Sequence, residues 1–363
     1  MSTGIEVPWS RLLGIAGALL ALRTQACEPT RTMPATIATD GNALLVAWEK
    51  PTDDGFTIYM RHVPDVQDGT TTLQGGTAIY TKKYGTTGYH GPEVATGPAG
   101  SIVIITPRVG EQIAIPVDLD GRVAGPAQPL TGCRSDSSDR TCFWSCRRPI
   151  AHAGGFIVGH VSAYPRSSIH SLDLSFLDRA GRTEKFLVLR SQDPVACAMA
   201  ASGDELVVVS TERETLVDVK IHVLFLALSD GELLNELWID GGYAFGIVST
   251  SANEYALLHQ IPDGRSVLTK FNRKGIESTH LVPEAIDLRT ADLGMSFRGL
   301  FVSWLANGRA HVLDLTTDRE VSRKGVARYS VGTRAVGVRD RCVTAWTSGA
   351  GNKVQLLAVP ECP

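Results

Sequence analysis

The chain has 363 residues, of which 43% are hydrophobic, and its 35 basic and 38 acidic residues leave a net charge of −3. This hydrophobic fraction is enough for a large core and excludes a disordered chain, while the balanced charge, without a basic patch, argues against a nucleic-acid partner. The 36 glycines and 18 prolines are typical of the many turns of an all-β protein.

The N-terminal segment predicts export. Arg11 precedes the apolar run Leu12–Leu22, which is too short to span a bilayer and has the length of a signal-peptide core. Ala26 and Cys27 follow, and this arrangement resembles a bacterial lipoprotein signal, in which the cysteine after the cleavage site is acylated. We therefore expect residues 1–27 to be a lipoprotein-like signal peptide with Cys27 as the lipidation site. Plain secretion and an unprocessed terminus are the alternatives.

From Met33 onward the chain repeats one unit of short strands. The clearest copy, Ala291–Arg319, has three apolar runs separated by the turns Arg298-Gly299 and Asn307-Gly308, and Asn-Gly is a strong hairpin signal. Aligning the copies on Trp304 gives seven units spaced 42 to 58 residues apart. The aligned positions are Trp48, Thr106, His160, Ser210, His259, Trp304 and Trp346.

A repeat of this length is the size of one four-stranded propeller blade. The pattern therefore predicts an all-β fold, a seven-bladed β-propeller of four-stranded antiparallel blades, formed by residues 28–363 as a single domain. We interpret the aligned Trp and His side chains as packing between blades, with metal or ligand binding by His160 and His259 as the less favoured alternative.

Three features depart from an even repeat. Blade 1 is expected to use Thr70–Gly75 as its fourth strand, and a polar, cysteine-rich insertion at 132–148 separates blades 2 and 3. Blade 7 has only three runs, which end with Lys353–Val359. Its closure is expected to use a brief N-terminal strand or a covalent link.

Cysteine counting suggests what that link is. Seven cysteines are present, and removal of Cys27 leaves six, which in an exported protein are expected to form disulfides and otherwise to be buried thiols. Cys342 opens the second strand of blade 7 and Cys362 follows the third, so folding of the hairpin brings them together. Cys146 and Cys197 are expected at similar heights on neighbouring blades. That pairing leaves Cys133–Cys142, although other pairings of these four remain open.

The strand and turn pattern from Met33 to the C-terminus resembles the bacterial extracytoplasmic propellers. That resemblance implies a protein that binds ligands or scaffolds assemblies. The Trp-Asp ends of WD40 blades and the repeated double glycine of kelch blades are absent. Ala227–Trp238 looks like a blade motif of pyrroloquinoline-quinone propellers, but it occurs once, so no cofactor is expected.

The sequence favours binding over catalysis. It contains no H-E-x-x-H, G-x-S-x-G, Walker A or Cys-x-x-Cys motif, and no metal site is expected. We expect a non-enzymatic binding or scaffold module in the bacterial periplasm or on the cell surface, attached to the membrane only through its lipid. The alternative is a lyase- or glycosidase-type propeller enzyme whose catalytic groups are spread over several blades.

The binding surface is expected on the face that carries the longer loops, because rigid scaffolds place function there. Aromatic and cationic residues, the types that dominate binding energy at interfaces, gather in three of these loops near blades 1 to 3. The candidate binding residues are Tyr84, Tyr89, His90, Trp144, Arg147, Arg148, Tyr164 and Arg166. Their partner is expected to be a protein, a peptide or a glycan. An ordinary solvated loop surface is the alternative.

Overall fold

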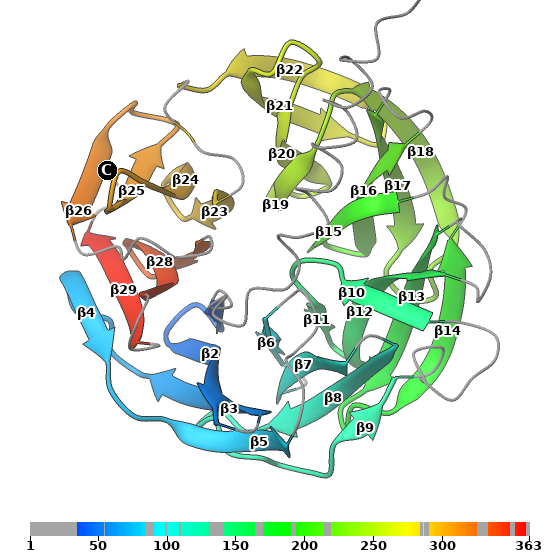
Figure 1. The fold of residues 1–363 in the computed structure, drawn as a ribbon. Coiled ribbons are helices and arrows are strands. Elements are labelled where there is room, and N and C mark those ends of the chain that lie inside the picture. The colour runs from blue at the N-terminus through cyan, green and yellow to red at the C-terminus, as the bar shows by residue number, and fades with distance from the viewer. Residues whose placement is uncertain are drawn as a thin grey trace, which may run out of the picture. The chain divides into compact units, whose positions relative to one another are not determined.

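The structure is a computed structural model, and its placed residues are 35–53, 55–83, 91–98, 100–108, 110–130, 141–163, 170–189, 194–213, 219–283, 286, 290–324, 333–348 and 353–360. Every regular element in these ranges is a β-strand, and the strands form seven antiparallel sheets in a ring (Figure 1). The seven-bladed β-propeller predicted from the repeat is therefore confirmed.

Each sheet is one blade, and its strands run in order from the channel outward. Blade 1 contains β1 (Thr36–Thr39), β2 (Leu44–Thr52), β3 (Gly55–Val63) and β5 (Thr77–Lys83), and blade 2 contains β6 (Glu93–Gly97), β7 (Gly100–Arg108), β8 (Glu111–Val117) and β9 (Gln128–Pro129). Blade 3 contains β10 (Thr141–Ser145) and β11 (Ile150–His152), then β12 (Gly155–Ala163), β13 (His170–Asp178) and β14 (Thr183–Leu189).

The remaining blades follow the same order. Blade 4 contains β15 (Pro194–Ser202), β16 (Glu205–Arg213), β17 (Val219–Ala227) and β18 (Leu233–Asp240), and blade 5 contains β19 (Ala244–Ser251), β20 (Glu254–Gln260), β21 (Ser266–Asn272) and β22 (Gly275–Leu281). Blade 6 contains β23 (Asp292–Ser296), β24 (Gly299–Ala306), β25 (Arg309–Asp314) and β26 (Glu320–Lys324). Blade 7 contains β27 (Arg334–Val338), β28 (Arg341–Ser348), β29 (Lys353–Pro360) and β4 (Gly69–Leu73).

The seven positions aligned on Trp304 all lie in the second strand of their blade, and all are buried. Their large side chains sit in the core between neighbouring sheets: Trp304 packs with Leu258 of blade 5, and Trp48 packs with Ala345 of blade 7. For Trp48, Trp304 and Trp346, the interpretation of this position as a packing site between blades is therefore confirmed.

Closure of the ring differs from the expectation. The fourth strand of blade 7 is present, and it is β4, which comes from within blade 1 and pairs with β29 from Val354↔Leu73 to Ala358↔Gly69 (Figure 1). The assignment of Thr70–Gly75 to blade 1 is wrong, because the chain crosses to blade 7 after β3 and then returns as β5. Leu73 is buried in the core that blades 1 and 7 share, and this burial holds the closing strand in place.

The inner strand of blade 3 is split. β10 pairs with the end of β12, β11 pairs with its beginning, and residues 147–149 leave the sheet between them. This segment pairs instead with β15 of blade 4, where the Arg147 amide donates to the Cys197 carbonyl at 3.1 Å and the Met199 amide donates to the Arg147 carbonyl at 3.2 Å. The second half of the cysteine-rich insertion therefore belongs to blade 3.

A disulfide fixes this crossing, because Cys146 is bonded to Cys197. The predicted disulfide between Cys146 of blade 3 and Cys197 of blade 4 is confirmed. Gly159 makes room for the bond, since a Cβ at this position would lie 2.6 Å from the Cys146 sulfur. Cys142 and Cys342 are also disulfide-bonded. Their predicted partners, Cys133 and Cys362, lie outside the described residues, so those two pairings stay predictions.

Candidate functional site

Five charged side chains from four blades gather in the central channel. They are Glu93 of blade 2, Arg147 and Arg148 of blade 3, Asp292 of blade 6 and Arg334 of blade 7, and we call them the axial cluster. Three of them open an inner strand: Glu93 begins β6, Asp292 begins β23 and Arg334 begins β27. The two others come from the crossing segment that the Cys146–Cys197 bond holds.

One half of the axial cluster is the ion pair between Glu93 and Arg334. Arg334 Nη2 lies 2.6 Å from Glu93 Oε1, and the Thr36 hydroxyl donates to Glu93 Oε2 at 3.5 Å. Both side chains are almost fully buried, with 4% of Glu93 and 10% of Arg334 exposed. Burial acts to lower the pKa of Arg334, but the charges of Glu93 and Asp292 outweigh it and raise that pKa above its ordinary value.

The other half is the ion pair between Arg148 and Asp292. Arg148 Nη2 lies 2.8 Å from Asp292 Oδ2 and also donates to the carbonyls of Leu293 and Ala335. The Ala335 amide donates to the same carboxylate oxygen at 2.8 Å. Arg148 adopts a left-handed backbone conformation, with φ of 65°, which is uncommon for a residue with a side chain and is found where the surrounding contacts enforce it.

Arg147 completes the axial cluster without a carboxylate of its own among the described residues. Its Nη1 donates to the carbonyl of Phe245 at 2.7 Å and to that of Ala291 at 3.4 Å. Burial, followed by repulsion from Arg334, lowers the pKa of Arg147 to about 10, so it remains charged at neutral pH. The axial cluster therefore holds three guanidinium groups and two carboxylates, and it joins the inner strands of several blades across the channel.

A cavity of about 310 Å³, which we call the axial cavity, lies beside these groups in the channel. Arg148, Arg334, Glu93 and Asp292 border it, together with Thr36, Thr39 and Thr96 and apolar residues of five inner strands. Such a cavity has the size and the mixed lining of a site for a small polar group. One oxygen of each carboxylate beside it already accepts a hydrogen bond from arginine, which limits its use as a proton acceptor.

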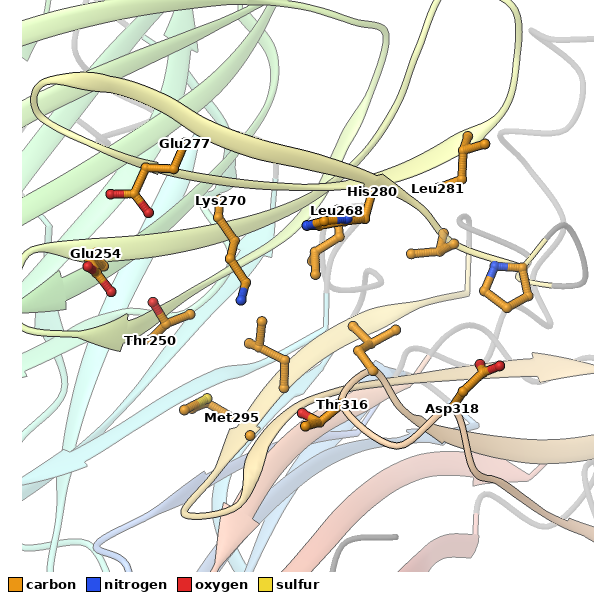
Figure 2. Close-up of a pocket in the computed structure, with 15 residues that line it drawn as sticks. Thr250, Glu254, Leu268, Lys270, Glu277, His280, Leu281, Met295, Thr316 and Asp318 are labelled. Carbon is orange, nitrogen blue, oxygen red and sulfur yellow. The ribbon is translucent and has the colours of Figure 1, made fainter.

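A larger recess of about 1040 Å³ lies between blades 5 and 6. Figure 2 shows Lys270, Glu277 and His280 on the blade 5 strands, across from Thr316 and Asp318 of blade 6. We call this the inter-blade recess. No pattern in the sequence indicates it, because its two walls come from different copies of the repeat.

The structure describes only part of the predicted binding surface. Arg147 and Arg148 lie in the channel and not on an outer loop. Trp144 belongs to β10, but its side chain is outside the description. The other five candidates, Tyr84, Tyr89, His90, Tyr164 and Arg166, lie outside the described residues. Whether these groups converge therefore stays a prediction.

Sequence reasoning missed Glu93, Asp292 and Arg334. A signal for them was present, because in three copies of the repeat a charged residue opens the innermost, otherwise apolar strand. The inner strands of all blades line one channel, so charges at their first residues can come together there.

Among the described residues, the buried His222 is not part of a hydrolase-type triad. His222 of blade 4 contacts Glu212 at 3.0 Å and Glu236 at 3.3 Å, and it stacks on Trp238. The nearby Ser210 hydroxyl donates to Glu212 at 2.8 Å. Activation of a serine nucleophile needs a hydrogen bond from the hydroxyl to the histidine base, so this group does not match a hydrolase triad.

His259 of blade 5 provides a prediction about pH. The ring is buried, its Nε2 lies 2.8 Å from the Thr269 hydroxyl, and burial lowers its pKa to about 4. The pKa of this residue in the unfolded chain is near 6.5, so below that pH the unfolded chain binds a proton that the folded protein does not. The contribution of His259 to the free energy of unfolding is therefore complete above pH 6.5 and should fall by about 3 kcal/mol between pH 6.5 and 4. Denaturant titrations across that range should show a smaller fall in His259→Gln. An equal fall in both proteins, or an imidazole that titrates near pH 6.5 by NMR, would contradict this.

Metal-binding clusters and membrane helices are both absent from the placed residues. No group of three or more His, Cys, Asp or Glu side chains among them is arranged to hold a metal ion. Nor does the described part of the chain contain a helix that is long and apolar enough to cross a membrane.

Comparisons with known proteins identify the fold and no family. No family model matches the chain, and no curated protein matches it. Among solved structures, the Dos1 propeller is similar with a TM-score of 0.51 and 7% identity over 91% of this chain and 93% of that one. BBS1N, solved in complex with ARL6DN, is similar with a TM-score of 0.53 and 10% identity over 90% and 91% of the two chains. At such identities the likeness extends to the propeller fold alone.

Proposed function

We propose that this chain is a binding or scaffold propeller without enzymatic activity, exported and anchored by a lipid on Cys27, with a protein, peptide or glycan as its partner. The observation that carries the proposal is the state of the carboxylates in the channel. Glu93 and Asp292, the two acids that border the axial cavity, are each held by an arginine at 2.8 Å or less. A general acid or base has to be available to a substrate proton, and these two groups are engaged instead.

The proposed binding face is the one that carries the long loops around blades 1 to 3. Tyr84, Tyr89 and Tyr164 are proposed to form this surface on the strength of their sequence positions. BBS1N shows that a propeller of this size can be solved with a protein partner, and this analogy is consistent with a binding role.

The partner should be captured through that face. Crosslinking in the native envelope with the wild-type chain should recover a partner that is lost when Tyr84, Tyr89 and Tyr164 are changed to serine. Val188→Ser is the matched control, because Val188 is an exposed residue on the outer strand β14 of blade 3. Loss of the partner in both variants, or in neither, would contradict the proposed face.

The lipid anchor has a separate test. Cys27→Ser should move the protein from the membrane fraction to the soluble fraction, because acyl chains on this residue are proposed to be the only membrane attachment. Fractionation followed by immunoblotting measures the partition. If Cys27→Ser stays with the membrane to the same extent as the wild-type chain, the lipid-anchor proposal is wrong, while the binding role is untouched.

One observation favours the alternative, a lyase- or glycosidase-type enzyme. Glu93 and Asp292 come from blades 2 and 6 and border the same cavity, as expected for catalytic groups spread over several blades. Depolymerisation of acidic and neutral polysaccharides by the purified chain, abolished by Asp292→Asn in a protein that remains folded, would establish the enzyme and overturn the proposal above.

A further inference from the structure

The inter-blade recess combines an apolar floor with a charged rim. Leu268 and Leu300 lie at its base, and Met295 and Leu315 extend the apolar surface on the blade 6 side. Its volume of about 1040 Å³ is at the upper end of the range for ligand sites. The recess therefore offers apolar contact area to a ligand larger than a single small molecule.

The rim of the recess is negatively charged. Glu254, Glu277 and Asp318 supply three carboxylates, and among the described residues Lys270 is the one ammonium group that lines the recess. In Figure 2 the carboxylates of Glu254 and Glu277 lie to one side of Lys270, and that of Asp318 lies near the opposite end. Polar side chains hold two of them, since Ser251 donates to Glu254 at 2.5 Å and Asn272 donates to Glu277. A cationic group is the complement to such a rim.

The recess continues into a strand edge. β22 is the outermost strand of blade 5, and it pairs only with β21 among the placed residues. Edge strands are normally protected from pairing by lysine or proline. The outer strands β5, β14 and β26 each carry lysine. In contrast, β22, with the sequence GIESTHL, has no lysine, arginine or proline, and the same is true of β18 and β4. Leu281, at the end of β22, is 60% exposed and also lines the recess.

We propose that an extended peptide segment of a partner protein pairs with the outer edge of β22 and places alternate side chains, apolar and cationic, in the inter-blade recess. In an added strand, alternate residues point to the same face about 7 Å apart. Backbone hydrogen bonds to β22 would supply affinity, and the acidic rim would select arginine or lysine. This is a second site, and it does not depend on the proposed long-loop face.

Synthetic peptides test the inference directly. The probe is an acetylated, amidated, fluorescein-labelled octapeptide with arginine and leucine in turn at its odd positions and serine at its even positions, so that both side-chain types lie on one face of an added strand. Its partner peptide has glutamate in place of every arginine. Fluorescence anisotropy with the purified chain should show binding of the arginine peptide and at least tenfold weaker binding of the glutamate peptide. N-methylation of alternate backbone amides should also weaken binding at least tenfold, because it removes the donors that pair with a strand edge.

Two matched variants locate the site. Leu281→Lys places a positive charge at the recess and should weaken binding of the arginine peptide at least tenfold. Leu234→Lys adds the same charge on β18 of blade 4, an outer strand that also lacks lysine, at a residue that is 39% exposed and does not line the recess. It should leave binding unchanged. Asp318→Asn should weaken binding several-fold and reduce the preference over the glutamate peptide.

Several outcomes would overturn the inference. They are equal affinity for the two peptides, equal losses in Leu281→Lys and Leu234→Lys, no binding at millimolar peptide, and hydrogen-exchange protection that maps away from β22. A dimer seen by sedimentation that Leu281→Lys dissolves would identify a second copy as the occupant and would also overturn it. None of these results would remove the long-loop face, which the crosslinking experiment tests on its own.

Discussion

Replacement of Cys146 with serine is expected to lower the free energy of unfolding by about 4 kcal/mol. The Cys146–Cys197 bond joins residues with a sequence separation of 51. In the loop-closure model, removal of a crosslink across a loop of that length increases the entropy of the unfolded chain, which lowers its free energy by about 4 kcal/mol. Such a loss is a large part of the 5–15 kcal/mol that keeps a typical domain folded. Denaturant titrations of the oxidised wild-type and variant proteins measure the difference.

Cys197→Ser and the double variant serve as controls for this experiment. If the two sulfurs act as one unit, all three variants should be destabilised to the same extent. Additive losses would mean that each cysteine contributes through its own packing and that the bond adds little.

The same bond should influence the axial cluster. It holds the segment that carries Arg147 and Arg148, and Arg148 in turn binds Asp292, which is only 1% exposed. In Cys146→Ser, hydrogen exchange should therefore accelerate at the Ala335 amide, which donates to Asp292. Unchanged exchange at Ala335 would mean that backbone pairing with β15 positions the segment without the bond.

The second large effect is expected at Arg334. Arg334→Met leaves the Glu93 carboxylate, 4% exposed, without its partner, and removal of one member of a buried ion pair typically costs about 3–5 kcal/mol. Thermal and denaturant unfolding should both show the loss. The cost arises from the isolated charge and not from the lost methylene contacts, since methionine keeps most of the apolar volume.

A double-mutant cycle separates these two causes. When Glu93→Met is combined with Arg334→Met, the total loss should be well below the sum of the single losses, because an apolar replacement of a whole buried pair is often nearly neutral. Additive losses would show that Glu93 and Arg334 act separately and that the ion pair does not stabilise the axial cluster.

The sequence predicted the fold because each copy of the repeat forms its strands and turns from residues that are close together in the chain. The alignment on Trp304 located the second strand of all seven blades, and Asn307-Gly308 adopts the predicted turn, with φ of 51° and 70° at the two residues. The Cys146–Cys197 pairing also followed from the repeat, since equivalent heights on adjacent blades bring side chains together.

The features that the sequence did not predict depend on contacts between residues far apart in the chain. β4 was assigned to blade 1 because it follows β3 in the chain, and nothing in its residues indicates that it pairs with β29. Arg148 was placed on a loop because it ends a polar, cysteine-rich segment, whereas its partner Asp292 is 144 residues away. Local patterns identify strands and turns, but they do not show which charges meet across a ring.

The origin of β4 has a consequence for how the protein folds. Thr72 and Gln355, which meet in the closing sheet, are 283 residues apart in the chain. The sheet of blade 7 cannot be completed until β29 has been synthesised. Until then the β4 segment remains unpaired, even if the earlier blades have already folded. Contacts of such high sequence separation form slowly, and an exposed strand in an intermediate promotes aggregation. Ring closure is therefore expected to be the last and rate-limiting step of folding, and the most vulnerable one.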